Sequence, residues 1–594
     1  MKLAKLNVAI DSTNSSARTL TKFRVSFRAL LLGSTVIIVS YLVVVPLIML
    51  LYASVKSTED KLPFESTVTT LGNYATVFTS PATLSIVLNT IVFTLGSLVV
   101  GLPLAILLAW LLERTALPAR GWIATFILMP MTIPSLLSAI AWIQLLDPHI
   151  GLINVALRNL FGWNSETGPF DIYSLSGMCF VQGLRLVPSA YLMIAASFGA
   201  MDPSLEEQSA MAGRNMAQTT MRVTLPIMRP ALLAALIYFM IVVIESFDIP
   251  GLLGFTARIR VLSTAIYWAT HSEVGLPDYG LASALGSMIL LAALLLMWIY
   301  QRLTAHQERF TTITGKGYRP RQVHLGSWRA PAMVFCAGYI FIAVLLPFLM
   351  LLWTSVQPFY AVPSAESFGR ASFEGYWAIW SDGSVVRALW NTTIIALVTA
   401  CATILLAVLV SWFVVRRKRE GDGLANYLAT VSFLPQCVPS IVIGLAFIFV
   451  YVRFPVPIYG TLWIIALAMT TRYLAYGSRA TTAALMQVHG ELEEASQMAG
   501  APWGRTLRRI TMPLLAPAMI NVFLWVAVHA MQELSMALML YNPNTVVVST
   551  MIWSMWQNGR TADAAVLGVV LTLLSALLLI MGHVVSRWRR AASS

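Results

Sequence analysis

Long apolar segments recur along the whole chain, and each is close to the roughly 20 residues that a helix needs to cross the hydrocarbon core of a bilayer. Few charges interrupt them, because only 11% of the 594 residues are charged, against about 25% in a soluble domain. The sequence therefore predicts an all-α polytopic membrane protein with twelve transmembrane helices and little room for a soluble catalytic domain. The segments are roughly 29–52, 86–112, 121–146, 172–199, 230–248, 281–301, 330–353, 389–415, 426–452, 459–484, 517–540 and 564–586.

The first apolar segment follows a polar and basic stretch, residues 1–28. The run from Ala29 to Tyr52 is longer than the apolar core of a signal peptide, and it lacks a clear cleavage site. We expect this run to be retained as the first membrane span.

The basic residues are divided unevenly between alternate loops. With the N-terminus placed in the cytoplasm, 27 of the 39 Lys and Arg residues lie on the cytoplasmic side, 9 lie on the other side and 3 lie within spans. This bias is the one that the positive-inside rule describes, so we expect both termini to be cytoplasmic. It also accounts for the net charge of +13 through contact with membrane lipid, without nucleic acid as a partner.

The two halves of the chain repeat one another. LMPMTIPS at 128–135 parallels FLPQCVPS at 433–440, and LNTIVFTL at 88–95 parallels WNTTIIAL at 390–397. Each half has six spans, an even number, so the halves share one orientation, as in parallel rather than inverted repeats. We expect a central path between them. The predicted parts are a cytoplasmic tail at 1–28, a six-helix domain at 29–301, a cytoplasmic linker at 302–329, a second six-helix domain at 330–587 and a cytoplasmic tail at 588–594.

One charged segment occurs twice, as EEQSAMAG at 206–213 and as EEASQMAG at 493–500. Both copies precede the fifth span of their half, on the predicted cytoplasmic side. Asp202-Pro203-Ser204 offers an N-cap with proline at the first helical position, the paired glutamates suit the first turn, and the closing glycine suits the helix end. A short amphipathic helix of this kind can dock into a groove on a partner; the alternative is a helix that lies on lipid.

The repeated segment resembles the EAA loop of ABC importer permeases, in which glutamate is followed six residues later by glycine and thirteen residues after that by proline. Both copies have this spacing. The first copy departs from the family in one detail, because Gln208-Ser209 stands where small residues are usual. The resemblance covers nearly the whole chain, and two such loops in one chain are similar to the fused permeases of the ferric-iron importer group. It assigns ATPase coupling to Glu206, Glu207, Ala212, Gly213, Leu225, Pro226, Glu493, Glu494, Ala495, Gly500 and Pro513.

The resemblance implies a type I importer fold and separate partner proteins. The partners would be an ABC ATPase homodimer on the cytoplasmic side and a periplasmic solute-binding protein, which would dock chiefly on the loops at 53–85, 147–171, 249–280 and 354–388.

Nothing in the sequence predicts catalysis or a cofactor. A P-loop needs Gly-x-x-x-x-Gly-Lys-Ser/Thr, but Gly315-Lys316 has Phe310 at the first-glycine position and Gly317 in place of the hydroxyl residue. The seven histidines show no spacing that suits a metal site. We therefore expect a non-catalytic membrane subunit, with ATP hydrolysed by another chain.

Six ionisable residues fall within or at the ends of the apolar segments, where such residues indicate function or pairing. They could line a translocation path, or they could form structural ion pairs of Arg472 with Glu533 and of Arg185 with Glu245; the sequence leaves both open. Two proline pairs, Pro130/Pro134 and Pro435/Pro439, are expected to break or kink their spans. The six residues are Arg185, Glu245, Asp248, Arg472, His529 and Glu533.

Taken together, the residues and the resemblance predict a permease of the bacterial inner membrane that imports ferric iron. Polyamine, thiamine, aminoethylphosphonate and sugar phosphate are the alternative cargoes. A different class, an ion-gradient-driven secondary transporter with Glu245, Asp248 and Glu533 as proton carriers, stays open, as does a channel.

Overall fold

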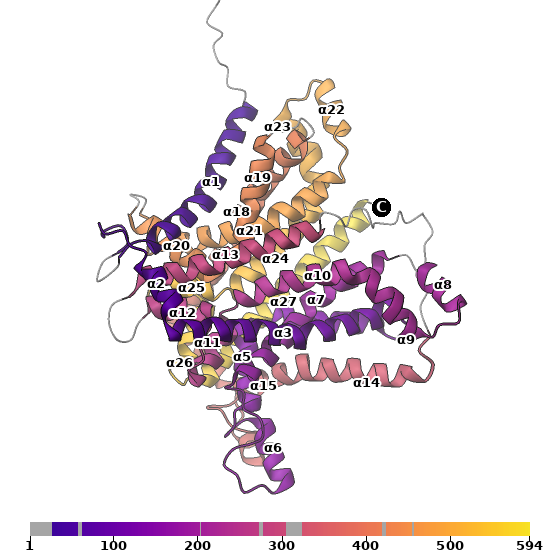
Figure 1. Cartoon of the computed structure of the whole chain (residues 1–594), viewed down its shortest axis with the longest axis vertical. Coiled ribbons are helices and arrows are strands. Elements are labelled where there is room, and N and C mark those ends of the chain that lie inside the picture. The colour runs from indigo at the N-terminus through magenta and orange to yellow at the C-terminus, as the bar shows by residue number, and fades with distance from the viewer. Residues whose placement is uncertain are drawn as a thin grey trace, which may run out of the picture.

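The computed structural model describes residues 27–593 except 58–61, 202–203, 272–276, 305–323, 419–422 and 454–456. The described residues are almost entirely helices and short loops, and their one β-type pairing is an isolated bridge between Lys56 and Thr69. Figure 1 shows the chain from the first helix, α1, to the last, α27, as one bundle with several helices extending beyond it. The predicted tail at 1–28 and linker at 302–329 lie mostly outside the described residues.

Each predicted span of the first half is a helix or a bent pair of helices. Leu, Ile and Val dominate these segments, and a helix satisfies its own backbone hydrogen bonds in an apolar surrounding. The six are α1 (Phe27–Ser54), α3 (Pro81–Arg114), α4 (Arg120–Leu128) with α5 (Ser135–Leu146), α7 (Leu175–Ala200), α10 (Leu225–Ile244) and α13 (Tyr279–Thr304).

The second half repeats this order. Its fourth predicted span, α21, carries Arg472 and Arg479, and it is not one of the nine helices of the described residues that are long and apolar enough to cross a membrane. The six are α14 (Arg329–Ile340) with α15 (Leu346–Ser355), α18 (Gly383–Lys418), α19 (Gly423–Phe433) with α20 (Ser440–Arg453), α21 (Leu462–Met486), α24 (Met512–Gln532) and α27 (Thr561–Ser593). Because α27 continues to Ser593, no helix break marks the predicted domain boundary at 587.

The proline pairs break their spans, as predicted. Residues Arg120–Thr132 and Ser135–Leu146 meet at 98°, and Gly423–Cys437 and Ser440–Val452 meet at 111°. At each break a 3₁₀ turn replaces the α-helix: η1 (Met129–Thr132) and η6 (Leu434–Cys437). Proline lacks the N–H for the helical bond and clashes with the preceding turn, so both bends have a direct cause in the sequence.

Part of the loop predicted at 249–280 is instead a buried pair of helices. The helices are α11 (Asp248–Ala257) and α12 (Leu262–Thr270), which meet at 77°, and Ile249, Leu252 and Leu253 are almost fully buried. The second half has the matching pair α25 (Ser535–Leu540) and α26 (Val548–Gln557), so the apolar segment predicted at 517–540 is interrupted after Gln532. Each helix of these pairs is too short to cross a bilayer alone, so it depends on the surrounding spans for burial.

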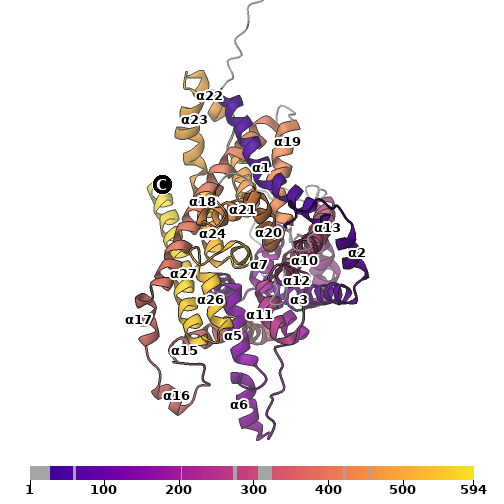
Figure 2. The same ribbon diagram turned by 90° about the vertical axis from the view of Figure 1, so that its left-hand side faces the viewer.

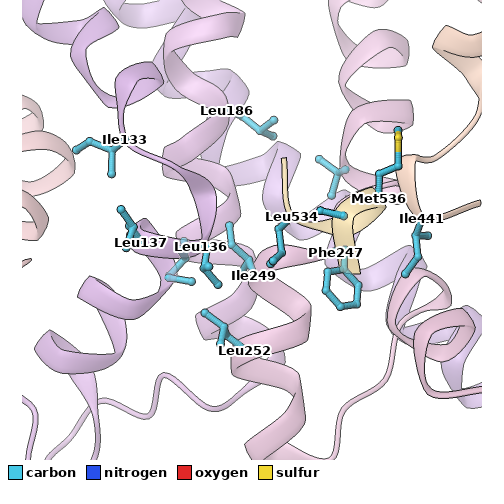
Figure 3. Close-up of a cluster of buried hydrophobic side chains, with 14 of the residues drawn as sticks. Ile133, Leu136, Leu137, Leu186, Phe247, Ile249, Leu252, Ile441, Leu534 and Met536 are labelled. Carbon is cyan, nitrogen blue, oxygen red and sulfur yellow. The ribbon is translucent and has the colours of Figure 1, made fainter. Parts of the chain in front are cut away.

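Close contacts between spans hold each half together. An added Cβ at Gly101 of α3 would lie 2.6 Å from the carbonyl oxygen of Gly183 of α7, and one at Gly183 would lie 2.6 Å from Cβ of Val100. Small residues let helices in a membrane approach closely. Between the halves, the Phe247 ring of the first half lies 5.7 Å from the Trp553 ring of the second, and Figure 3 shows Phe247 near Leu534. One apolar core therefore runs through both halves.

Smaller helices extend from the two ends of the bundle. Helices α22 (Glu491–Met498) and α6 (Leu152–Phe161) lie at opposite ends in Figure 1 and in Figure 2. Helix α8 (Ser204–Met211), the counterpart of α22 in the first half, lies apart from α22 on the right-hand side of Figure 1. Helix α16 (Ala365–Gly369), which with α17 (Glu374–Ser381) follows the first span of the second half, lies near the α6 end in Figure 2. The ends of the molecule therefore carry different sets of connecting helices.

Candidate functional site

A cavity of about 430 Å³ lies between the halves, and all six ionisable residues singled out from the sequence line it. The spans α7 and α10 contribute from the first half and α21 and α24 from the second, together with the two proline breaks. The wall is strongly polar, with three carboxylates, two guanidinium groups and a histidine. The remaining polar and aromatic lining includes Ser135, Gln182, Ser189, Tyr238, Ser246, Gln436, Ser440, Tyr473, Tyr476, Trp525, Gln532 and Ser535.

The two arginines occupy equivalent places and fasten equivalent structures. Arg185 Nη1 donates a hydrogen bond of 2.9 Å to the carbonyl oxygen of Ile133. Arg472 Nη1 donates one of 2.6 Å to the carbonyl oxygen of Pro435. Because the proline break leaves carbonyl groups without helical partners, each arginine supplies a donor to the break in its own half.

An ion pair joins the two halves across the cavity. Arg472 Nη2 lies 2.6 Å from Glu245 Oε1, and the side chains are only 10% and 15% exposed. Of the two ion pairs that the sequence left open, neither is among the ion pairs of the described residues: Arg472 pairs with Glu245 of the opposite half, and Arg185 bonds the Ile133 carbonyl oxygen. Gln532, which stands 287 residues after Glu245 as Arg472 does after Arg185, donates to the carbonyl oxygen of Thr132 at 3.1 Å. The ion pair therefore forms at only one of the two matching positions of the repeat, because the second half has a glutamine where the first has Glu245.

The other two carboxylates are held by hydroxyl groups. Asp248 accepts hydrogen bonds from Ser135 and, at 3.5 Å, from Ser535 of the opposite half. Glu533 accepts from the Tyr473 hydroxyl at 3.2 Å and from the Met536 backbone N–H at 3.3 Å. Both carboxylates therefore have donors in the apolar interior, as buried polar groups require.

His529 lies at the end of an aromatic stack in the same wall. Its ring is 3.8 Å from that of Trp525, which is 3.8 Å from that of Tyr476, and His529 Nδ1 is 2.8 Å from the Trp525 carbonyl oxygen. Among the described residues, no group of three or more His, Cys, Asp or Glu side chains is arranged to hold a metal ion. The cavity can surround a polar or charged solute with hydrogen-bonding groups, with three carboxylates against two guanidinium groups.

The repeated segment forms the same structure in both halves. Helices α8 and α22 each end at a glycine with positive φ, +79° at Gly213 and +82° at Gly500. The N–H of Arg214 bonds the Ser209 carbonyl oxygen at 3.2 Å, and that of Ala501 bonds the Ser496 carbonyl oxygen at 3.1 Å. This is the helix termination for which glycine is suited. The predicted N-cap at Asp202-Pro203 lies outside the described residues.

The two glutamates of each copy face different ways. Glu206 and Glu493 turn inward: Glu206 Oε2 lies 3.6 Å from Arg114 Nη1, and Glu493 Oε1 lies 2.9 Å from Arg416 Nη2. Glu494 is exposed and Glu207 is half-buried. The sequence reading singled out neither arginine, because a basic residue at the cytoplasmic end of a span is ordinary; their matching positions, 302 residues apart, were the available signal.

Apolar side chains project outward from both loop helices. Met211 is 87% exposed and its counterpart Met498 is 89% exposed. Leu205 and Leu492 are also exposed, as are Ala212 and Ala495. The loops then return to the bundle through a π-helical turn and a proline near the start of the next span, which is Pro226 after Leu225 in α10 and Pro513 in α24.

The duplicated set of apolar helices defines a multi-pass membrane protein with a cavity between its halves. The family model for the binding-protein-dependent transport system inner membrane component matches residues 101–309 and 418–590, and the chain belongs to this family. It is thus an ABC importer permease of the binding-protein-dependent type, with two copies of the family domain, as the sequence predicted.

Known proteins are similar to this chain over different lengths. The ferric transport system permease protein FbpB of Actinobacillus pleuropneumoniae is 26% identical over 83% of this chain and 69% of its own length. A putative 2-aminoethylphosphonate transport system permease protein, PhnV, of Salmonella choleraesuis is 28% identical over 34% of this chain and 76% of its own. A solved bacterial alginate ABC transporter, in complex with an alginate pentasaccharide-bound periplasmic protein, matches at 17% identity over 44% of this chain and 95% of its own, with a TM-score of 0.36.

Proposed function

We propose that this chain is the membrane subunit of an ATP-driven ferric-iron importer, in which α8 and α22 dock into two ATPase subunits. One observation carries the coupling part: two loop helices, 287 residues apart, present the same exposed Leu and Met above an inward-turned Glu that pairs with an Arg. Exposed apolar side chains on a rigid helix suit a groove on a partner protein, and two equal helices suit two equal partners.

The central cavity supplies the path in this proposal. ATP-driven closure of the two ATPase subunits would move the halves against one another and open the cavity to alternate sides, as a rigid-body switch. The Arg472–Glu245 pair and the Gln532–Thr132 contact cross between the halves, so both must break when the halves separate. A solute-binding protein would deliver cargo to the end of the bundle that carries α6, α16 and α17.

Ferric iron is the proposed cargo because the FbpB relative is similar over 83% of the chain, whereas the PhnV relative is similar over 34%. Three carboxylates in the cavity are compatible with a cation. The chain would supply no catalytic residue, so the energy would come entirely from the ATPase partners.

The coupling proposal is tested by co-purification with an ABC ATPase co-expressed from the same genome. The double variant Met211→Glu/Met498→Glu places charges on both exposed apolar patches and should abolish co-purification. Leu160→Glu is the matched control, because Leu160 is 76% exposed on α6 at the other end of the bundle. ATPase binding by the double variant equal to that of the control would refute docking at these helices.

The cargo is tested separately in proteoliposomes that contain the whole assembly and its binding protein. In vesicles whose lumen corresponds to the cytoplasm, radioactive ferric iron added outside should accumulate in the lumen only when the lumen contains ATP. Uptake that follows an ion gradient without ATP would instead support a secondary transporter. ATP-dependent uptake of 2-aminoethylphosphonate in place of iron would keep the permease class and refute the cargo.

A further inference from the structure

The inward-turned glutamate of each loop helix belongs to a three-part contact that the two halves build from matching residues. We name this contact the clamp: Glu206 with Arg114 and Thr224 in the first half, and Glu493 with Arg416 and Thr511 in the second. Thr224 Oγ1 donates to Glu206 at 2.6 Å and Thr511 Oγ1 donates to Glu493 at 3.1 Å. Each clamp therefore joins the loop helix to the end of a long span and to the π-helical turn that follows the loop.

The clamp arginine also holds the chain on the entry side of the loop. Arg114 Nη2 donates to the Met201 carbonyl oxygen at 3.1 Å, and Arg416 Nη2 donates to the Val488 carbonyl oxygen at 3.3 Å. Met201 and Val488 are again 287 residues apart. One guanidinium group thus fixes the loop helix and the segment that leads into it, while the threonine fixes the segment that leads out.

Burial makes the charges hard to explain by stability alone. The side chains of Arg114 and Glu206 are 2% and 14% exposed, and those of Arg416 and Glu493 are 13% and 7% exposed. Removing two charges from water costs free energy that their attraction often fails to recover, so a buried ion pair is weak evidence for stability. Its attested advantage is a fixed register between the elements that it joins, and this chain keeps it in both halves.

The geometry points to a positioning role, which rests on the proposed docking of the ATPase. We propose that the clamp makes each loop helix and the cytoplasmic end of α3 or α18 move as one body, so that displacement of the outward face reaches the cavity. The outward face carries Met211 or Met498, and the inward face carries the clamp glutamate. Because α3 packs closely on α7 at Gly101 and Gly183, motion of α3 also moves Arg185, which lies on α7.

The two clamps differ in strength. The second has the shorter ion pair, 2.9 Å against 3.6 Å. It also has a further donor, because Trp412 Nε1 lies 3.3 Å from Glu493 Oε2, and the Trp412 ring packs edge-on against Trp503 at 5.0 Å. The same substitution should therefore impair transport more in the second half than in the first.

The test uses the complete transporter in proteoliposomes, with its ATPase and iron-loaded binding protein. Glu493→Gln should leave the ATPase attached but lower iron transported per ATP hydrolysed at least tenfold, and Glu206→Gln should lower it less. Arg560→Gln is the control: it breaks the exposed Arg560–Asp563 pair of 2.8 Å and should leave transport unchanged. A wild-type assembly without bound ATPase would refute the proposed function, whereas a normal transport-to-hydrolysis ratio in Glu493→Gln would refute only the clamp.

A second variant separates positioning from folding. Arg416→Met/Glu493→Gln removes both charges together, so neither remains buried and unpaired, and the protein should be nearly as stable as the wild type in a thermal unfolding assay. If the clamp positions the loop helix, this variant remains poorly coupled although it is stable. Recovery of wild-type transport per ATP in the double variant would overturn the proposal, because the pair would then serve stability alone.

Discussion

The ion pair between the halves gives the sharpest quantitative prediction about the cavity. Arg472 and Glu245 are 2.6 Å apart and at most 15% exposed, so removing one partner leaves a charge in a poorly hydrated place. Breaking such a pair costs about 3–5 kcal/mol of unfolding free energy. We expect this cost for Glu245→Gln, and a cost near the upper end for Arg472→Met, which also loses the bond to Pro435.

The double variant distinguishes pairing from separate effects. If the two costs were independent, Glu245→Gln/Arg472→Met would lose about 6–10 kcal/mol. Because the second substitution removes the charge that the first left unpaired, we expect a loss of about 5 kcal/mol or less, which corresponds to a coupling energy of at least about 1–5 kcal/mol.

The measurement is equilibrium unfolding in mixed micelles by titration with a denaturing detergent, followed by tryptophan fluorescence. Glu245→Gln combined with Arg185→Met is the control, since the structure gives Arg185 a backbone acceptor, Ile133, in place of Glu245. Costs for Glu245→Gln and Arg472→Met that add to within about 0.5 kcal/mol would refute the ion pair between the halves.

Three further predictions concern other parts of the fold. Gly183→Val places a side chain against Val100, where an added Cβ would already lie at 2.6 Å, and it should lower the melting temperature more than Gly199→Val, which has open space. Asn154→Ala removes an amide that donates to the carbonyl oxygens of Leu146, Asp147 and Phe170; it should cost about 1–3 kcal/mol and speed protease cleavage within 147–171, whereas unchanged cleavage would contradict the bracing. Gly500→Ala forces a positive φ of +82° on alanine, which costs about 1–2 kcal/mol, and it should weaken ATPase binding relative to Gly504→Ala.

The membrane spans were predictable because their information is local. A run of about 20 apolar residues predicts a membrane-spanning helix, and a proline pair within it predicts a break, whatever the distant parts of the chain do. The helices α11 and α12 were missed for the opposite reason. Each is about half the length of a span, so its burial depends on neighbours such as Trp553, which lies near Gly251 and stands far away in the sequence.

The sequence predicted which charged residues line the cavity, but it did not predict which of them pair with one another. Ionisable residues in apolar segments identified all six charged residues of the cavity, since such residues are rarely placed there without a partner or function. Their partners depend on how the halves face one another. Arg472 meets Glu245 because the arginine of one half crosses to the other, and no spacing within either half encodes that contact. The coupling role of the loops stays a prediction.

Residues that differ between matching positions of the two halves make the two walls of the cavity chemically different. Glu245 corresponds to Gln532, and Asp248 corresponds to Ser535. A permease assembled from two identical subunits would carry each of these residues twice, so its two walls would always mirror one another. Covalent fusion removes this constraint: each wall can change alone, so at these two positions a solute meets a carboxylate on the first flank and a neutral amide or hydroxyl on the second, while Glu533 opposite Ser246 reverses that order.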